Sequence, residues 1–407
     1  MAPSLRIVAS NHDPAVAVTE GAIPKRARLE SIDILRGVIM ILMALDHTRD
    51  FFGQTSFSPT DPTQTTIPLF FTRWLTHFCA PVFFLLTGTG AYLSLRKKSK
   101  AELSKFLFTR GLWLIFLELT LFRCLGLQFN FDYHLTLLDV LWAMGWAMIV
   151  LSALVHLPTP LVTALGLVMI AGHNLLDPIQ SSNPVWSILH SLNFIVATPR
   201  HSVFVAYVLI PWVGVTAVGY GLGQIYTWAS DRRRTFLLRS GLGVIAAFVI
   251  LRGINTYGDP FRWSTQKSAA FTALSFLNTS KYPPSLLFLL MTLGPALLFL
   301  WAVDGGTPQF LRPALALGKV PMFYYLLHFP LIHLLAVAVC YLRYGQVHWM
   351  FESATLDKFP ITPPPGWGFS LPVVYLIWVS VVVALYPLSR WFAALKQRRS
   401  DAWLSYF

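Results

Sequence analysis

Ionisable side chains gather within an otherwise apolar stretch of the chain, Leu45-Asp46-His47-Thr48-Arg49-Asp50-Phe51. A carboxylate that contacts an imidazole can orient the ring and raise its basicity, which is what a proton-transfer site needs. Neighbouring residues on a helix point about 100° apart, so the true partner of His47 could also come from another segment. The stretch predicts either a proton-handling site or a polar collar at a membrane interface, and both interpretations stay open.

A second group of polar residues follows in Arg73-Trp74-Leu75-Thr76-His77. Arg73 and His77 are one helical turn apart and share a face. The segment returns from the side at which the previous one ends, so His77 is expected at a depth comparable to that of His47. The two histidines could therefore converge on one site. For each of them, a buried ring that is hydrogen-bonded to a backbone carbonyl is the alternative.

Other candidates stand in further apolar segments. Asp33 and Arg36 are three residues apart and can pair locally, and we favour a structural role for this pair. Arg110 must be paired or hydrated, because a bare charge in lipid is costly. His328, which follows Tyr325 by three residues, could line the same cavity as His47.

Composition indicates the elements that must position these side chains. The 407 residues are 55% hydrophobic and 12% charged, with a mean hydropathy of +0.58, which is more apolar surface than a soluble domain buries. We predict an all-α, polytopic bundle of about ten membrane-spanning helices. The fifth is short and also compatible with a re-entrant segment, so the count is ten give or take one. The spans are expected near 32–52, 67–94, 103–125, 134–156, 159–176, 202–229, 236–254, 283–303, 319–342 and 370–395.

The basic residues predict the orientation of the bundle. The net charge of +13 comes from short clusters between apolar segments rather than from one basic face, so we expect no nucleic acid partner. With ten spans, four clusters fall on one side, taken as cytoplasmic together with both chain ends. They are Lys25–Arg28, Arg96–Lys105, Arg232–Arg239 and Lys396–Arg399.

The sequence predicts one domain with a short tail at each end. Residues 1–27 are expected to form a disordered cytoplasmic tail, 28–396 a single transmembrane domain, and 397–407 a C-terminal cytoplasmic tail. The three cysteines lie in apolar segments without Cys/His spacing, so neither a disulfide nor a metal site is indicated.

Five stretches, in order along most of the chain, resemble bacterial proteins of the heparan-α-glucosaminide N-acetyltransferase-like membrane family. The resemblance implies an acyltransferase that uses cytoplasmic acetyl-CoA to modify an amine or hydroxyl, often on a sugar, at the far face of the membrane. The stretches are residues 28–37, 41–52, 80–88, 281–286 and 318–331.

The resemblance leaves the catalytic base open. In characterised relatives a histidine between the first two spans is regarded as catalytic, but residues 53–66 of this chain contain none. The role would pass to His47 or His77, which bracket that segment. We expect His47 to be the base, supported by Asp46, with His77 as an orienting or second base.

The remaining polar residues are assigned to the donor and the acceptor. No Gly-rich phosphate loop is recognisable, so basic side chains would have to hold CoA or a developing oxyanion, and Arg36, Arg73 and Arg110 are the candidates. His328, Tyr325, Arg49 and Asp50 are expected to contact the acceptor.

A transporter or flippase is the rival interpretation, because buried ion pairs and Gly/Pro-interrupted spans are equally expected there. The expected partners are the lipid bilayer of a bacterial inner membrane, an acyl-CoA donor and a glycan or small-molecule acceptor. A homodimer is left open.

Overall fold

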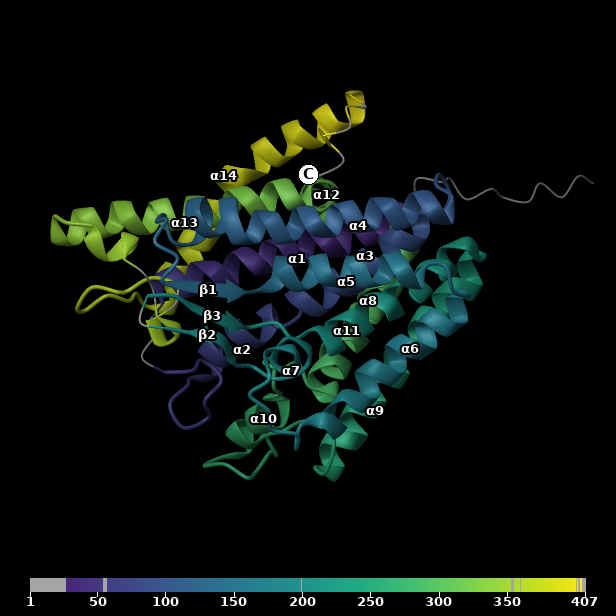
Figure 1. Ribbon diagram of the computed structural model, residues 1–407, viewed down its shortest axis with the longest axis horizontal. Helices are drawn as coiled ribbons and strands as arrows, with labels where there is room; N and C mark the ends of the chain where they lie inside the picture. Colours follow the sequence, from purple (N-terminus) through teal and green to yellow (C-terminus); the bar gives the residue numbers. More distant parts are fainter. Residues whose placement is uncertain are drawn as a thin grey trace, which may run out of the picture.

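The computed structural model describes residues 27–53, 57–198, 200–352, 355–358, 360–399, 401 and 403–404. The predicted tail of residues 1–27 therefore lies almost wholly outside the described residues, as does part of 397–407. The described chain is mostly helical (Figure 1). Its longer helices are α1 (Ala27–Phe52), α3 (Cys79–Ser94), α4 (Lys100–Leu117), α5 (Val140–Leu154), α6 (Thr159–Gly172), α8 (Leu209–Gly223), α9 (Ser230–Ile254), α11 (Leu286–Asp304), α13 (Pro321–Tyr344) and α14 (Leu371–Arg398).

Several helices are suited to a lipid environment. Among the described residues, six helical segments are long and apolar enough to cross a membrane: Ile67–Ser94, Thr159–Leu176, Ser230–Ile254, Leu286–Asp304, Pro321–Tyr344 and Leu371–Arg398. The prediction of a helical integral membrane protein agrees with this finding. The count of ten spans and the cytoplasmic position of both chain ends stay predictions.

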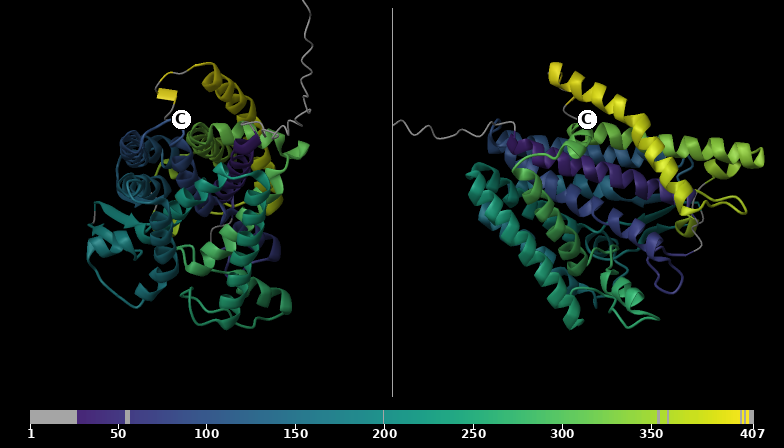
Figure 2. Two further views of the ribbon diagram at one scale, coloured as in Figure 1. Left: turned by 90° about the vertical axis from the view of Figure 1, so that its right-hand side faces the viewer. Right: turned by 180° about the vertical axis from the view of Figure 1, so that it is seen from behind.

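The helices run alternately in opposite directions (Figures 1 and 2). We name the end of the bundle at which α1 begins the first end, and the end at which α1 finishes the second end. At the first end, a buried Arg233–Asp304 ion pair joins the start of α9 to the finish of α11. At the second end, the amide of Phe369 donates to the carbonyl of Phe52, which joins the connection before α14 to α1.

Two close helix contacts depend on glycine. A Cβ atom on Gly37 of α1 would stand 1.9 Å from the carbonyl oxygen of Ala314 in α12 (Arg312–Lys319), and one on Gly88 of α3 would stand 1.9 Å from that of Thr216 in α8. No side chain fits at these distances. Small residues of this kind let helix backbones approach each other, which is the main source of packing between helices in a membrane.

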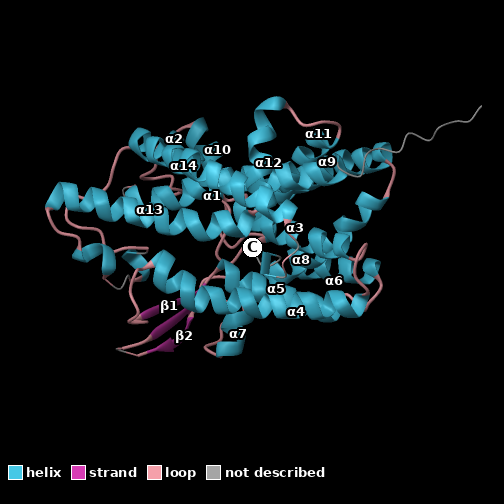
Figure 3. Cartoon of the chain, turned by 90° about the horizontal axis from the view of Figure 1, so that it is seen from above, coloured by secondary structure: helices cyan, strands magenta, loops and turns pink. Residues whose placement is uncertain are grey.

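A small sheet lies at the second end and departs from the all-α expectation (Figure 3). The strands are β1 (Leu135–Leu138), β2 (Phe194–Ala197) and β3 (Ser202–Val205), in the order β1-β3-β2. β3 is parallel to β1 and antiparallel to β2. The predictions that helices begin at 134 and 202 were wrong, because a short apolar run is compatible with either a strand or a helix.

Candidate functional site

A break in the second predicted span positions His77. α2 (Ile67–Thr76) ends just before His77, and α3 begins at Cys79. Pro81 lacks the N–H that would bond to the carbonyl of His77, and its ring would crowd that carbonyl. The helix is therefore interrupted at this point, and the His77 ring packs edge-on against Phe288 of α11 with 5.4 Å between the centroids.

Asp46 is the centre of a buried ionic cluster that joins α1 to α2. Nη1 of Arg73 lies 2.7 and 2.8 Å from its two carboxylate oxygens, and the hydroxyl of Thr76 donates to it at 2.7 Å. Nη2 of Arg49 lies 2.8 Å from it as well. Asp46 and Arg49 are each only 7% exposed. Such charges persist in an apolar surrounding only when they are paired, so the cluster fixes α2 against α1.

His47 faces away from this cluster. Its ring centroid lies 4.2 Å from that of Phe329 and 5.2 Å from that of His328, both on α13. The carboxylate that faces it is Asp50, at 3.9 Å from Nδ1, because residues three apart on a helix share a face whereas neighbours do not. The support of His47 by Asp46 stays a prediction.

His328 lies beside His47, as expected. Its Nδ1 is 3.1 Å from the carbonyl of Tyr324. A carbonyl only accepts, so Nδ1 carries the proton and Nε2 is left as an acceptor; within the described residues, that Nε2 has no hydrogen-bond partner. Tyr325 packs against His328 with 5.5 Å between the ring centroids. His328 and Tyr325 thus form a buried aromatic pair beside His47.

A polar cavity of about 480 Å³ opens at the second end. His77, Arg73, Arg49 and Asp50 line it, whereas His47 does not. Of the two histidines, only His77 lines this cavity, so the expected convergence of both on one cavity is not seen here. The cavity is completed by Phe57–Thr60, Phe261 and Asn278–Tyr282.

Arg252 and Asp259 hold the loop that forms one wall of this second-end cavity. Arg252 donates to the carbonyls of Phe261 and Asn278 at 2.8 and 2.7 Å. Asp259 accepts from the hydroxyl of Ser285 at 2.6 Å; burial raises the pKa of Asp259 despite the lowering effect of its hydrogen bonds. Sequence reasoning missed both residues, and also Lys281, although an arginine close to the end of an apolar helix was a signal for Arg252.

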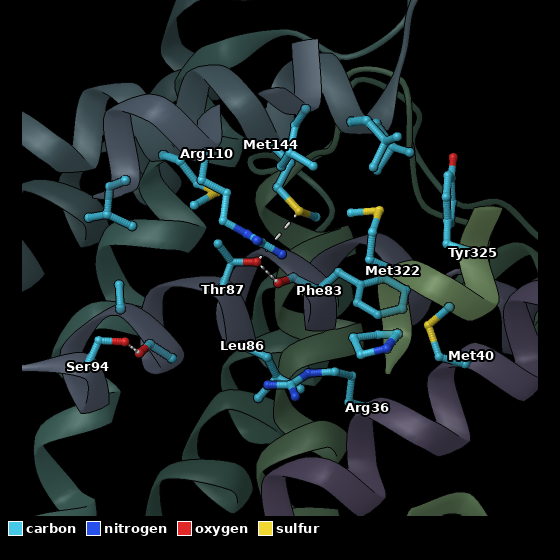
Figure 4. A pocket seen from close by; sticks show the side chains of 18 of the residues that line it. Arg36, Met40, Phe83, Leu86, Thr87, Ser94, Arg110, Met144, Met322 and Tyr325 are labelled. Atoms are coloured by element: carbon cyan, nitrogen blue, oxygen red, sulfur yellow. Dashed lines mark hydrogen bonds between the residues drawn. The ribbon is translucent and has the colours of Figure 1, made fainter. Parts of the chain in front are cut away.

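An apolar cavity of about 300 Å³ lies between α1, α3, α4, α5 and α13 and reaches the first end (Figure 4). Arg36 and Arg110 line it from α1 and α4, together with Lys319 and Lys396. Its interior is lined by methionines and other apolar side chains, and Tyr325 also contributes. The structure thus brings Arg36 and Arg110 to one cavity, whereas Arg73, expected with them, lines the cavity at the second end.

One face of α1 connects the first-end cavity to His47. Arg36, Met40 and Met43 line the cavity, and the spacing of four and three residues places them on one side of the helix. His47, four residues after Met43, is the next residue on this side. The stripe therefore runs from a basic rim, past two methionines, to an imidazole that faces Asp50.

A comparison with protein families shows to which family the chain belongs. The catalytic-domain model described as "Heparan-alpha-glucosaminide N-acetyltransferase, catalytic" matches residues 28–255, more than half of the chain. The chain belongs to this family. The match covers α1 to α9 and therefore contains the Asp46 cluster, His47, His77 and the two arginines of the first-end cavity. A search of curated proteins finds no match.

Proposed function

We propose that the protein is a membrane-embedded acyltransferase that moves an acetyl group from cytoplasmic acetyl-CoA to an amine or hydroxyl of a sugar or envelope glycan at the periplasmic face of a bacterial inner membrane. The observation that carries the proposal is the stripe of α1 in which Arg36, Met40 and Met43 line the first-end cavity. His47 follows four residues later, and Asp50 lines the second-end cavity. Membership of the acetyltransferase family supports the same reaction class.

The first-end cavity suits the acyl donor. CoA carries anionic phosphates on a long, largely uncharged arm, so it requires cations at one end of its site and an apolar channel beyond them. Arg36 and Arg110 supply charge-assisted donors for phosphate, and Lys319 and Lys396 line the same space. The arm would extend along Met40 and Met43, which places the thioester near His47.

The second-end cavity suits a polar acceptor. Its wall combines Arg49, Arg73 and Lys281 with hydroxyl and amide side chains. Within the described residues, Nη1 of Arg49 and Nδ1 of His77 are buried and have no hydrogen-bond partner. An acceptor with several hydroxyl groups would satisfy both atoms, and Asp50, which lines this cavity, would orient it.

The chemistry follows from this placement. An acceptor held in the second-end cavity would extend past Asp50 to the His47 ring and give its N–H or O–H proton to that ring as its heavy atom attacks the thioester carbonyl. The C–S bond then breaks, and the imidazolium returns the proton to the leaving sulfur, so that CoA is released as the thiol. Asp50 steadies the ring as positive charge develops on it. His328 and Tyr325 pack around the reacting groups, and His77 orients the acceptor.

The test is release of CoA by purified protein incubated with acetyl-CoA and a panel of amino sugars and glycans. We expect release that depends on the acceptor and an acetylated product in the mass spectrum. Transport of the glycan into proteoliposomes without any CoA release would favour the transporter interpretation and contradict the proposal. The homodimer stays a prediction, to be measured by light scattering of the same preparation.

A further inference from the structure

Three potential metal ligands meet at the second end, outside both cavities. His173 begins the 3-10 turn His173–Leu176 that follows α6, Asp177 comes directly after that turn, and His190 follows α7 (Pro184–Leu189). One ligand atom from each residue lies within 4.8 Å of the other two. Nε2 of His190 is 3.0 Å from the Asp177 carboxylate, and the two imidazole centroids are 5.8 Å apart.

The two imidazoles carry unsatisfied nitrogen atoms. His173 is 1% exposed and His190 is 2% exposed. Within the described residues, both ring nitrogens of His173 and Nδ1 of His190 have no hydrogen-bond partner. A buried polar atom without a partner costs roughly 1–3 kcal/mol. A fully buried imidazole that bonds to nothing and lies beside a second imidazole and a carboxylate therefore indicates a missing ligand.

The surroundings hold the Asp177 carboxylate in place. The side-chain amide of Asn174 donates to Asp177 at 2.9 Å, and its carbonyl oxygen accepts from the amide of Leu286 at 2.8 Å. The carboxylate is thus oriented by a second residue, as metal-binding carboxylates usually are.

We propose that His173, Asp177 and His190 bind a divalent transition-metal ion, with Zn²⁺ as the best match. Zinc sites commonly combine imidazole nitrogen with carboxylate oxygen, at bond lengths of about 2.0–2.2 Å, and a water completes a tetrahedron when the protein supplies three ligands. Calcium and magnesium prefer oxygen ligands and are disfavoured by two imidazoles.

The ion would act as a clamp on the second end. Its ligands come from the finish of α6 and from the segment after α7, and Asn174 ties the same point to the start of α11. The three ligand atoms already lie within 4.8 Å of one another, and a bound ion would hold them about 3.3 Å apart, the separation that such bond lengths give in a tetrahedron. The ion would thereby fix the segment after α7 against the end of α6.

The test is metal binding by the purified full-length protein after treatment with a chelator. Co²⁺ titration followed by visible absorption, and Zn²⁺ titration followed by calorimetry, should show one site. His173→Ala, Asp177→Asn and His190→Ala should each weaken Zn²⁺ binding by more than the roughly 10–100-fold expected from loss of a supporting residue alone. His348→Ala, at an exposed histidine of the same end, should bind as the wild type does.

A thermal readout separates loss of the site from loss of the fold. Zn²⁺ should raise the denaturation midpoint of the stripped wild type and of His348→Ala, and should leave that of His173→Ala unchanged. The proposal is overturned if the stripped wild type binds no Zn²⁺, or if the three ligand variants bind it as tightly as the control. In either case the His190–Asp177 pair would be an ordinary ion pair.

Discussion

The two cavities differ in the elements that build them. The cavity at the first end lies between helices and is lined largely by apolar side chains, with its charges confined to Arg36, Arg110, Lys319 and Lys396. The cavity at the second end is built partly from loops and is lined mainly by polar and charged groups. Helix faces thus provide a cavity with a largely apolar lining, and loops provide a lining with varied hydrogen-bonding groups.

The two ends of α1 show the same contrast in their ion pairs. Asp33 and Arg36 pair at 3.1 Å within one helix and are both partly exposed. Asp46, in contrast, is buried and binds Arg73 from another helix. The first pair adjusts a charge at a rim, whereas the second determines where α2 and the wall of a cavity lie.

The largest expected effect is on the rate of acetyl transfer. His47→Ala should lower kcat for acetyl transfer by about 10²–10⁴-fold, the usual contribution of a general base, without a change in the denaturation midpoint. CoA release under saturating acetyl-CoA measures it, with His348→Ala as the matched control. If His47→Ala keeps its turnover and His77→Ala loses it, the base lies in the second-end cavity and the contrast drawn above is reversed.

The second-largest expected effect is on stability, and it compares the ion pairs at the two ends of α1. Asp46→Asn leaves Arg73 and Arg49 without their shared partner, so we expect a loss of about 3–5 kcal/mol in stability. Asp33→Asn is the control, and it should cost only about 0–1 kcal/mol because its pair is partly exposed. Thermal denaturation in detergent measures both. Equal midpoints would mean that the Asp46 cluster does not hold α2.

A smaller effect separates donor from acceptor binding. Arg110→Ala should raise KM for acetyl-CoA by about 10–100-fold, the loss expected for a hydrogen bond to a charged group, and leave kcat nearly unchanged. Arg239→Ala, at an exposed arginine of α9, should behave as the wild type. If Arg110→Ala instead raised KM for the acceptor, the first-end cavity would bind the acceptor and the second-end cavity would bind the donor.

The smallest effect concerns the second-end cavity alone. Lys281→Ala should raise KM for the acceptor several-fold, in line with about 1 kcal/mol for a net hydrogen bond, and should leave KM for acetyl-CoA unchanged. Lys267→Ala provides the control, because Lys267 is exposed on the same connection between α9 and α11. An unchanged KM for the acceptor in the Lys281 variant would remove this lysine from the site.

Hydropathy was sufficient to predict a mostly helical membrane protein, because the length of an apolar segment is a local property of the sequence. The helix break at His77 was also encoded locally, in Pro81, although it was not predicted. The side-chain partners of these residues could not be predicted locally. Asp46 binds Arg73, and His47 faces Asp50 and α13. These contacts depend on how the helices are rotated, which neighbouring residues in the sequence do not determine.

Contacts between distant segments were the least predictable. His173 and His190 are 17 residues apart and come from different elements, so no short motif marks them. The strands at 135–138 and 202–205 pair over a still larger separation, 67 residues from Leu135 to Ser202, and each was predicted as part of the helix that follows it. Both features arise only when the segments at the second end come together.

The most direct measurement is an experimental structure of the protein with acetyl-CoA bound. We predict that the CoA phosphates lie against Arg36 and Arg110, that the arm follows Met40 and Met43, and that the thioester reaches the His47 ring. Density for the nucleotide against Arg73 and Lys281 in the second-end cavity would contradict this assignment of the two cavities.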